Sequence, residues 1–478
     1  MPSEKEKLSL ALVGCLILTS TWLFPGDPMR VEEWISWSSL LLLGVPFLAN
    51  WRAPREEFLS ALHSSRNVFS NPIQRAYVLA LICLIGSLAI SVLNPSHEPS
   101  YIPGSNVPIL SQREYLEWMP ASALAPESRT KVLSLGILLA VTGPCTFFLF
   151  ERRQTIRILL WLVVANIVVL AICGLFVKLT GNTKILGKFE PADARYFFST
   201  FTYKNHWGAY CLIALGAMGA LANHDLQTRT DRWARSRRSV LPILVLASVL
   251  VGITVPLSGS RSCTILYGLF LVFFLGKLLS RVMTTPKIFG KGTNILLSGA
   301  AALALGIGIL ALSLFLHPET REEMQRTTAR QFENIKQGKI ETRFYISRDT
   351  LKMYREKPVW GWGLGTYRFI INDPDRFLGD EHEYSYVYAH NDWLHYLAEI
   401  GIIGFGLLVA LVISPFILYK NQGLLNPVSS WLWGTVFLLW AYSFVEFPCR
   451  TPAVSTLLTV IIALGTKYSI LEKRWRTG

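Results

Sequence analysis

The chain is organised by long apolar runs that recur along almost all of its 478 residues. A helix needs about 20 apolar residues to cross a bilayer, and about twelve runs come close to that length. The sequence therefore predicts an all-α polytopic membrane protein, and an even number of crossings places both termini on one side. The runs cover residues 8–24, 34–49, 76–93, 132–150, 156–177, 207–222, 240–257, 263–279, 295–316, 392–419, 431–447 and 454–470.

Composition agrees with this interpretation and excludes several other classes. Hydrophobic residues make up 51% of the chain and charged residues only 16%, which is far from the average for soluble domains. The seven cysteines lie in or beside apolar runs and form no CxxC pair, so neither a disulfide framework nor a zinc site is indicated. The net charge of +14 falls mostly between apolar runs, where topology explains it, and no nucleic-acid partner is expected.

The connections between the runs differ in positive charge, and this bias predicts the orientation of the chain. Arginine and lysine are frequent in the connections on the side of the termini, at residues 52–75, 152–157, 229–238, 277–291 and 473–476. Short loops rich in these residues stay in the cytoplasm, so both termini are expected there. The opposite loops are sparse in positive charge except for residues 178–204, which carry Lys184, Lys188, Arg195 and Lys204. Binding of an anionic group would explain this exception.

The longest polar stretch, residues 317–389, lies on the expected outer side and is too long for a simple connection. Residues 319–336 and 343–354 have helical spacing, and Pro358 ends the second helix before a flexible glycine-rich turn. We expect a helical cap over the outer face of the bundle. The predicted division is a transmembrane region at 1–316, this outer loop at 317–389 and a C-terminal transmembrane region with its tail at 390–478. The smaller outer loop, residues 94–131, shows little sign of a domain.

Two arginines near the expected outer membrane face are candidate phosphate ligands. Arg261 stands in a very short turn between two apolar runs, where a guanidinium is costly and usually has a partner or a task. Its planar fork suits a phosphate, and an interfacial anchor is the alternative. Arg195 lies in an aromatic segment before the span at 207–222, where an ordinary headgroup contact is the alternative, and the two arginines together would suit a diphosphate. Arg343 lies in an amphipathic pattern, where a solvated helix face is the simpler explanation.

His390 is the strongest candidate for acid–base chemistry. It lies at the expected outer face, and histidine can take a proton from a sugar hydroxyl as that hydroxyl attacks. Asn391 stands beside it to orient the ring or a substrate hydroxyl. His395 and Glu399 are four residues apart on one helical face, and their pairing would offset the cost of a buried carboxylate. For His390 alone, a satisfied interfacial histidine is the alternative.

Other chemistries find less support in the sequence. Histidine, aspartate and glutamate are frequent in residues 380–395, but no helical HExxH spacing occurs, so no catalytic metal is expected. The glycines of residues 361–365 lack the preceding strand and the βαβ unit of a dinucleotide site. No GxSxG elbow or phosphate-binding P-loop is present. We therefore expect no cofactor.

The pattern around His390 resembles a known signature. His390-Asn391, followed after nine residues by Gly401 and Gly404, is similar to the H-N-x9-G-x-x-G signature of the O-antigen ligase and polymerase superfamily. Ser260-Arg261 resembles the Ser-Arg that follows a span in this family. Residues 201–205 (FTYKN) and 358–365 (PVWGWGLG) resemble its aromatic, Asn-bearing start of a span and its Gly-rich turn. The resemblance covers most of the chain and is strongest over residues 195–404.

This resemblance implies a GT-C-like helical bundle in the bacterial inner membrane. It implies an inverting, metal-independent glycosyltransferase that moves a glycan from undecaprenyl diphosphate to an acceptor hydroxyl at the periplasmic face. His390, with Asn391 beside it, would be the base, and Arg261 and Arg195 would bind the diphosphate. Arg343 matches the family's arginine before the Gly-rich turn and would join them. With diphosphate as the leaving group, catalysis needs only charge stabilisation and one proton transfer.

Several functions are consistent with the sequence. The acceptor is a lipid A core for a ligase of lipopolysaccharide, another lipid-linked repeat for a polymerase, or a protein side chain for an O-oligosaccharyltransferase. The first two are favoured because no motif for a protein acceptor is found. A transporter of a small anion would show broken spans at matched positions in two halves, whereas the candidate groups here gather on one face. A purely structural assembly protein would leave the outer positive charge and the His-Asn pair unexplained.

Overall fold

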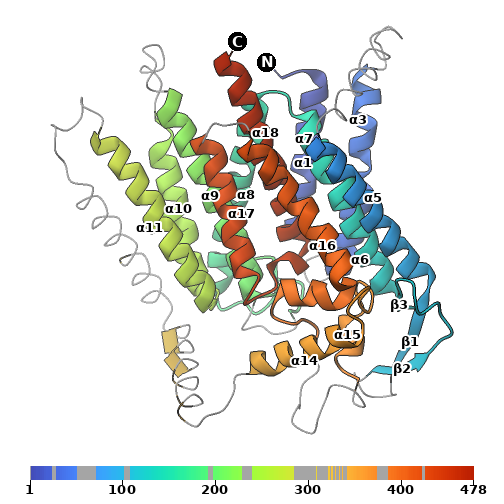
Figure 1. Cartoon of the computed structure of the whole chain (residues 1–478). Helices are drawn as coiled ribbons and strands as arrows, with labels where there is room; N and C mark the ends of the chain where they lie inside the picture. The colour runs from blue at the N-terminus through green and yellow to red at the C-terminus, as the bar shows by residue number, and fades with distance from the viewer. Residues whose placement is uncertain are drawn as a thin grey trace.

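The structure is a computed structural model, in which α-helices form a bundle with one small sheet at its end (Figure 1). It describes residues 2–23, 28–50, 72–101, 108–191, 197–228, 239–284, 308, 321–322, 325–326, 329, 333, 336, 342–373, 386–421 and 426–477. Within these residues, six helices are long and apolar enough to cross a membrane. The prediction of an all-α polytopic membrane protein is confirmed.

The helices follow the predicted runs closely wherever the structure describes them. The first part of the bundle consists of α1 (Glu4–Trp22), α2 (Pro28–Ser39), α3 (Leu41–Asn50), α5 (Pro72–Leu93), α6 (Pro126–Ile137), the π-helical turn η2 (Leu138–Thr142), α7 (Gly143–Leu149) and α8 (Arg153–Leu179). The remaining helices are α9 (Lys204–Thr228), α10 (Leu241–Leu257), α11 (Arg261–Thr284), α14 (Thr342–Glu356), α15 (Tyr367–Ile370), α16 (Asp392–Lys420), α17 (Pro427–Tyr442), the 3-10 turn η4 (Pro448–Arg450) and α18 (Pro452–Thr477).

Some predicted features fall outside the described residues, and others differ from the prediction. Arg195, the run at 295–316, residues 380–383 and most of 319–336 lie outside the described part, so the total of about twelve crossings stays a prediction. The predicted run at 34–49 is two helices, α2 and α3. The span predicted to reach residue 447 ends at Tyr442, where α17 stops.

The two ends of the chain lie at the same end of the bundle, as an even number of crossings requires (Figure 1). The opposite end carries α14, α15 and the sheet. In the sheet, β1 (Pro95–Tyr101) pairs antiparallel with β2 (Pro108–Gln112) and parallel with β3 (Ser122–Ala123). The sequence did not predict these strands, because their proline and serine content is untypical of β-structure.

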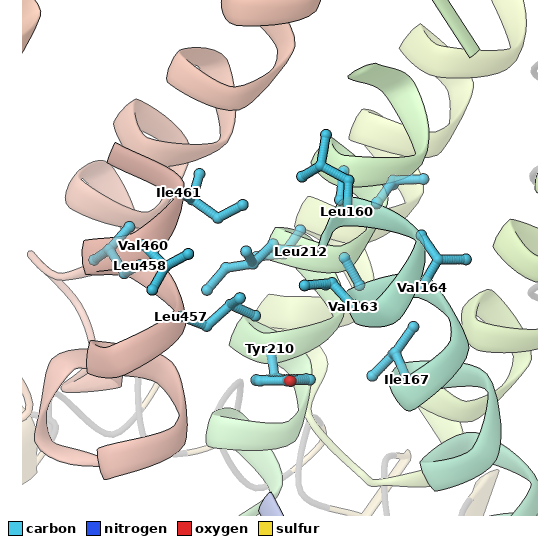
Figure 2. Packing of buried hydrophobic residues seen from close by; sticks show 14 of the residues in the cluster. Leu160, Val163, Val164, Ile167, Tyr210, Leu212, Leu457, Leu458, Val460 and Ile461 are labelled. Carbon is cyan, nitrogen blue, oxygen red and sulfur yellow. The ribbon is translucent and has the colours of Figure 1, made fainter. Parts of the chain in front are cut away.

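The central helix of the bundle is α9, in which every residue from Asn205 to Asn223 is buried. It contacts α8, α10, α11, α17 and α18. A Cβ atom on Gly216 would overlap the side chain of Thr435 in α17, so the small residue allows the two helices to pack closely. Figure 2 shows side chains of α8, α9 and α18 interdigitating in this core, among them Leu160, Leu212 and Ile461.

The helix α16 is broken at Gly401, which has φ 62° and ψ −176°. The Gly-rich turn that precedes His390 satisfies the backbone groups freed by this break. The N–H of Ile402 donates to the carbonyl of Pro358 at 2.8 Å, and the N–H of Gly363 donates to the carbonyl of Glu399 at 2.7 Å. The turn that we expected to be flexible is therefore packed against the broken helix.

Candidate functional site

The candidate site is centred on Glu446, a carboxylate between α17 and α18 that is only 1% exposed. Its Oε1 accepts hydrogen bonds from Asn205 Nδ2 at 2.7 Å and from Arg343 Nη2 at 2.5 Å. Its Oε2 lies 3.5 Å from Nδ1 of His390. One buried carboxylate thus brings together side chains from the start of α9, from α14 and from the segment before α16.

The backbone holds Glu446 in place against the start of α16. The N–H of Asp392 donates to the carbonyls of Ser443 at 2.9 Å and of Glu446 at 3.3 Å. In return, Oδ2 of Asp392 accepts a hydrogen bond from the N–H of Cys449 at 2.9 Å. The loop after α17 and the segment that carries His390 are therefore fixed relative to each other.

His390 has a φ of 51°, which is uncommon for a residue with a side chain. Strained backbone of this kind occurs preferentially at functional sites. The imidazole is 26% exposed and meets the ring of Phe447 edge-on, with the ring centroids 4.9 Å apart. The ring is therefore held by its neighbours while part of it remains accessible to a substrate.

Asn391 is the N-cap of α16, and its side-chain oxygen accepts a hydrogen bond from the N–H of Leu394 at 3.0 Å. Such a cap satisfies one of the free N–H groups at a helix start. In the structure, Asn391 therefore caps the start of α16 directly after His390. Its expected role toward the ring or a substrate hydroxyl stays a prediction.

Opposing effects act on the pKa of Glu446. Burial raises the pKa of this carboxyl group, but the interaction with His390, the positive charge of Arg343 and the hydrogen bond from Asn205 together lower it below the ordinary value for glutamate. The group is therefore a carboxylate at neutral pH, and it carries a negative charge in an enclosed place. Such a charge interacts strongly with its neighbours because little water screens it.

The Ser-Arg turn reaches the same cluster through Asn205. The side-chain oxygen of Asn205 accepts a hydrogen bond from Ser260 Oγ at 2.5 Å, and its Nδ2 also donates to the hydroxyl of Tyr203 at 3.0 Å. Arg261 follows Ser260 directly and begins α11. The FTYKN segment and the Ser-Arg turn are separate patterns in the sequence. In the structure these hydrogen bonds join them.

Arg343 is placed by α14 at the edge of this cluster. Besides its ion pair with Glu446, its Nη1 donates to the carbonyl of Val445 at 3.1 Å. The side chain is 43% exposed, so part of it remains open to solvent. The simple explanation of a solvated helix face does not hold, because the guanidinium contacts the buried carboxylate. Its role toward a diphosphate stays a prediction, as do those of Arg261 and Arg195.

A second buried network lies next to the first, within α16 and η4. His395 Nε2 lies 3.4 Å from Glu399 Oε1, as the four-residue spacing predicted. Glu399 Oε2 accepts a hydrogen bond from Arg450 Nη1 at 3.0 Å, and Arg450 Nε lies 3.5 Å from Asp392 Oδ1. Nδ1 of His395 faces the N–H of Ala389 at 3.4 Å, immediately before His390. This arrangement fits the supporting role expected for His395 and Glu399, which stays a prediction.

Glu446 and Arg450 were not among the candidates found from the sequence. A signal was present, because a charged residue in an apolar run is costly and usually functional in a membrane protein. Glu446 falls within the apolar run at 431–447, whose composition predicts a single span. Asn205 is part of the FTYKN motif, but the sequence alone does not indicate it as a site residue.

The described residues contain no cluster of three or more His, Cys, Asp or Glu side chains that would suit a metal ion. The acidic and histidine-rich residues 380–383 lie outside the described part. The expectation of metal-independent chemistry therefore stays a prediction.

An apolar cavity of about 410 Å³ lies beside the site, among α5, α6, α7, α16 and α18. Residues of α16 line it at the start of the helix, at Asp392, Trp393 and Tyr396, and again from Leu408 to Leu418. Its charged lining residues are Glu32, Lys131, Asp392 and Arg450. The cavity therefore combines a long apolar wall with a few polar groups, two of which belong to the buried networks of the site.

The fold and the site define a multi-pass helical membrane protein with acid–base and cationic side chains gathered at one end of its bundle. Residues 246–409 match the family model described as O-antigen ligase. This match includes Ser260-Arg261, Arg343, His390 and the Gly401 break, and it confirms the resemblance to the O-antigen ligase and polymerase superfamily. It supports glycan transfer of this general type as the activity. A search of curated proteins finds no match for the chain.

Proposed function

We propose that this protein transfers a glycan from undecaprenyl diphosphate to an acceptor hydroxyl at the periplasmic face of the bacterial inner membrane. The reaction inverts the anomeric carbon and uses neither a metal nor a cofactor. The acceptor is a lipid A core if the protein is an O-antigen ligase, or another lipid-linked repeat if it is a polysaccharide polymerase. The observation that carries this proposal is the convergence of His390, Arg343 and the Ser260-Arg261 turn around Glu446.

In the proposed mechanism, the accessible nitrogen of His390 takes the proton of the acceptor hydroxyl. The hydroxyl oxygen attacks the anomeric carbon, and the bond between that carbon and the diphosphate oxygen breaks. The electron pair leaves with the diphosphate, where Arg261, Arg343 and Arg195 stabilise the negative charge that develops. Attack from the face opposite the leaving group inverts the configuration. The leaving diphosphate supplies the driving force, so no nucleotide is required outside the membrane.

The apolar cavity supports a lipid-linked donor. Its lining residues on α16 lie at Asp392, Trp393 and Tyr396 before the Gly401 break and from Leu408 to Leu418 after it, and most of the lining is apolar, as a hydrocarbon chain requires. A hydrocarbon chain lying along this lining would have its head near Asp392, two residues from His390. The carrier lipid would thus bring its diphosphate to the cationic end of the bundle.

The proposed orientation rests on the distribution of positive charge. The connections rich in arginine and lysine are those that the sequence predicts on the side of the termini, and we assign this side to the cytoplasm. The end with α14, α15 and the sheet, which is opposite to the termini (Figure 1), then faces the periplasm. On this assignment, His390 would act at the periplasmic face.

The proposal is tested by the size distribution of carrier-linked glycans in a strain that lacks the protein, complemented with wild type or with His390→Ala. We expect His390→Ala to accumulate in the membrane in normal amount and to behave like the empty vector. Long carrier-linked chains that fail to reach their acceptor identify a ligase, and single repeats identify a polymerase. A glycan distribution that does not respond to loss of the protein would overturn glycan transfer.

A further inference from the structure

The two oxygens of Glu446 have different partners. Oε1 accepts from both Asn205 and Arg343, whereas Oε2 lies 3.5 Å from Nδ1 of His390, and neither of these two atoms makes a hydrogen bond within the described residues. If Glu446 served only as a structural ion pair with Arg343, its Oε2 would not need to face a partly exposed histidine. The arrangement resembles that of a carboxylate that orients a catalytic imidazole.

We propose that Glu446 is the positioning residue of His390, holding the ring through Nδ1 so that Nε2 faces the acceptor hydroxyl. This inference rests on the proposed function, because it assumes that His390 is the base. A neutral imidazole that directs Nδ1–H toward a carboxylate presents the lone pair of Nε2. When Nε2 takes the proton, the carboxylate also stabilises the positive charge that appears on the ring.

The surroundings restrict the ring in the same sense. Phe447 lies edge-on to His390. The rings of Tyr388 and Tyr203 stack on Phe447, with their centroids 4.5 Å and 5.2 Å from the centroid of Phe447. The aromatic ring next to the imidazole is therefore itself held by two stacked rings. A ring held by a carboxylate on one side and by a fixed aromatic edge on another has little freedom to rotate.

The charged and titratable groups that interact with Glu446 come from several elements around it. They are Arg343 of α14, His390 before α16, Tyr203 and His206 at the start of α9, Cys263 of α11 and Tyr442 at the end of α17. Of these, only Arg343 is permanently cationic, and it is bound to Oε1. The negative charge at Oε2 is therefore available to His390 when the ring becomes protonated.

The test uses the purified full-length protein with a lipid-diphosphate-linked glycan donor and compares Glu446→Gln with wild type. Gln keeps the size and the acceptor for Asn205 and Arg343 but removes the charge. We expect kcat to fall about 100-fold while KM for the donor changes little. The pH profile of kcat should also change, because the variant removes the negative charge beside the ring. Glu446→Asp, which keeps the charge, should restore part of the rate.

Glu472→Gln is the matched control. Glu472 is also a buried carboxylate paired with an arginine, Arg153, and it is 5% exposed, but it belongs to the C-terminal helix near the end of the chain. The Glu472→Gln variant loses the same kind of ion pair, but the substituted residue does not contact the site. We expect the kcat per folded molecule and the pH profile of this control to match wild type. If kcat and the pH profile of Glu472→Gln change as much as those of Glu446→Gln, the effect is general destabilisation and the inference is overturned.

The remaining outcomes separate the two proposals. If His390→Ala is inactive while Glu446→Gln has the turnover and pH profile of wild type, the positioning role is wrong and the proposed function stands. If His390→Ala turns over normally, the base itself is wrong. Should Glu446→Gln fail to accumulate, the nitrogen shifts of labelled histidine in the wild-type protein decide the question. Nδ1–H on His390 is the expected tautomer, and Nε2–H would overturn the inference.

Discussion

Gly361 and Gly401 pack backbone against backbone where the outer turn meets the broken membrane helix. A Cβ atom on Gly361 would lie 2.5 Å from the amide nitrogen of Gly401, and one on Gly401 would lie 2.6 Å from the amide nitrogen of Gly361. Both residues also have positive φ, 73° and 62°. Only glycine meets both conditions. The Gly-rich turn and the first glycine of the H-N-x9-G-x-x-G pattern are therefore two halves of one contact.

Replacing Gly401 by Ala should destabilise the folded protein. The methyl group meets the backbone of the Gly-rich turn and must also adopt a left-handed conformation, which together cost about 2–5 kcal/mol. The thermal unfolding midpoint in detergent measures this loss. Gly406→Ala is the control, because it lies on the same helix with nothing within 4 Å of its added Cβ. Equal midpoints for the two variants would contradict the packing argument.

Arg261→Lys should lower kcat/KM for the donor although the positive charge is kept. A lysine ammonium cannot reproduce the two parallel hydrogen bonds that a guanidinium makes to a phosphate. We expect a loss of about tenfold or more, equivalent to roughly 1.4 kcal/mol of transition-state binding. The same exchange at Arg152, which is 53% exposed and faces Glu6 rather than the site, should leave turnover unchanged. A wild-type rate for Arg261→Lys would indicate a membrane anchor.

Acid should weaken the fold through Glu446. Burial raises the pKa of this group, but His390, Arg343 and Asn205 lower it below the ordinary glutamate value, so the folded state prefers the carboxylate. The stability contributed by this preference is present above the pKa of the unfolded chain, about 4.3, and is lost as pH falls toward the folded pKa. Unfolding midpoints between neutral and acidic pH measure it. Glu446→Gln should fall less steeply over this range than wild type, and identical slopes would exclude the linkage.

A bulky residue in the apolar cavity should impair use of a long-chain donor. Val412 lines the cavity, so Val412→Trp occupies part of the space proposed for the carrier chain. We expect kcat/KM for the polyprenyl-linked donor to drop about tenfold, with a smaller effect on a donor carrying a short chain. The neighbouring Ile413 is 40% exposed and does not line the cavity, so Ile413→Trp should have little effect. Equal losses for both donors would argue against this location of the chain.

The sequence by itself determined the class of the protein and the positions of most helices. The run predicted at 156–177 corresponds to α8 (Arg153–Leu179), and the run at 454–470 corresponds to α18 (Pro452–Thr477). Such agreement follows because crossing a bilayer requires about 20 apolar residues in a row, which is a local property of the chain. His390, Arg261 and Arg343 were recognisable for a related reason, since their residue types and neighbouring motifs already indicate their chemistry.

The tertiary structure alone decided which residue joins these groups. Glu446 and Asn205 are 241 residues apart in sequence, and nothing in either segment shows that they meet. Their contact depends on α17 ending at Tyr442, so that the chain turns and directs Glu446 toward α9, α14 and the start of α16. Helix packing and the loops between helices fix such distances, whereas hydropathy reports only whether a segment prefers lipid or water. For this reason the sequence indicated His390 and the arginines as candidates, and the buried carboxylate of Glu446 emerged only from the fold.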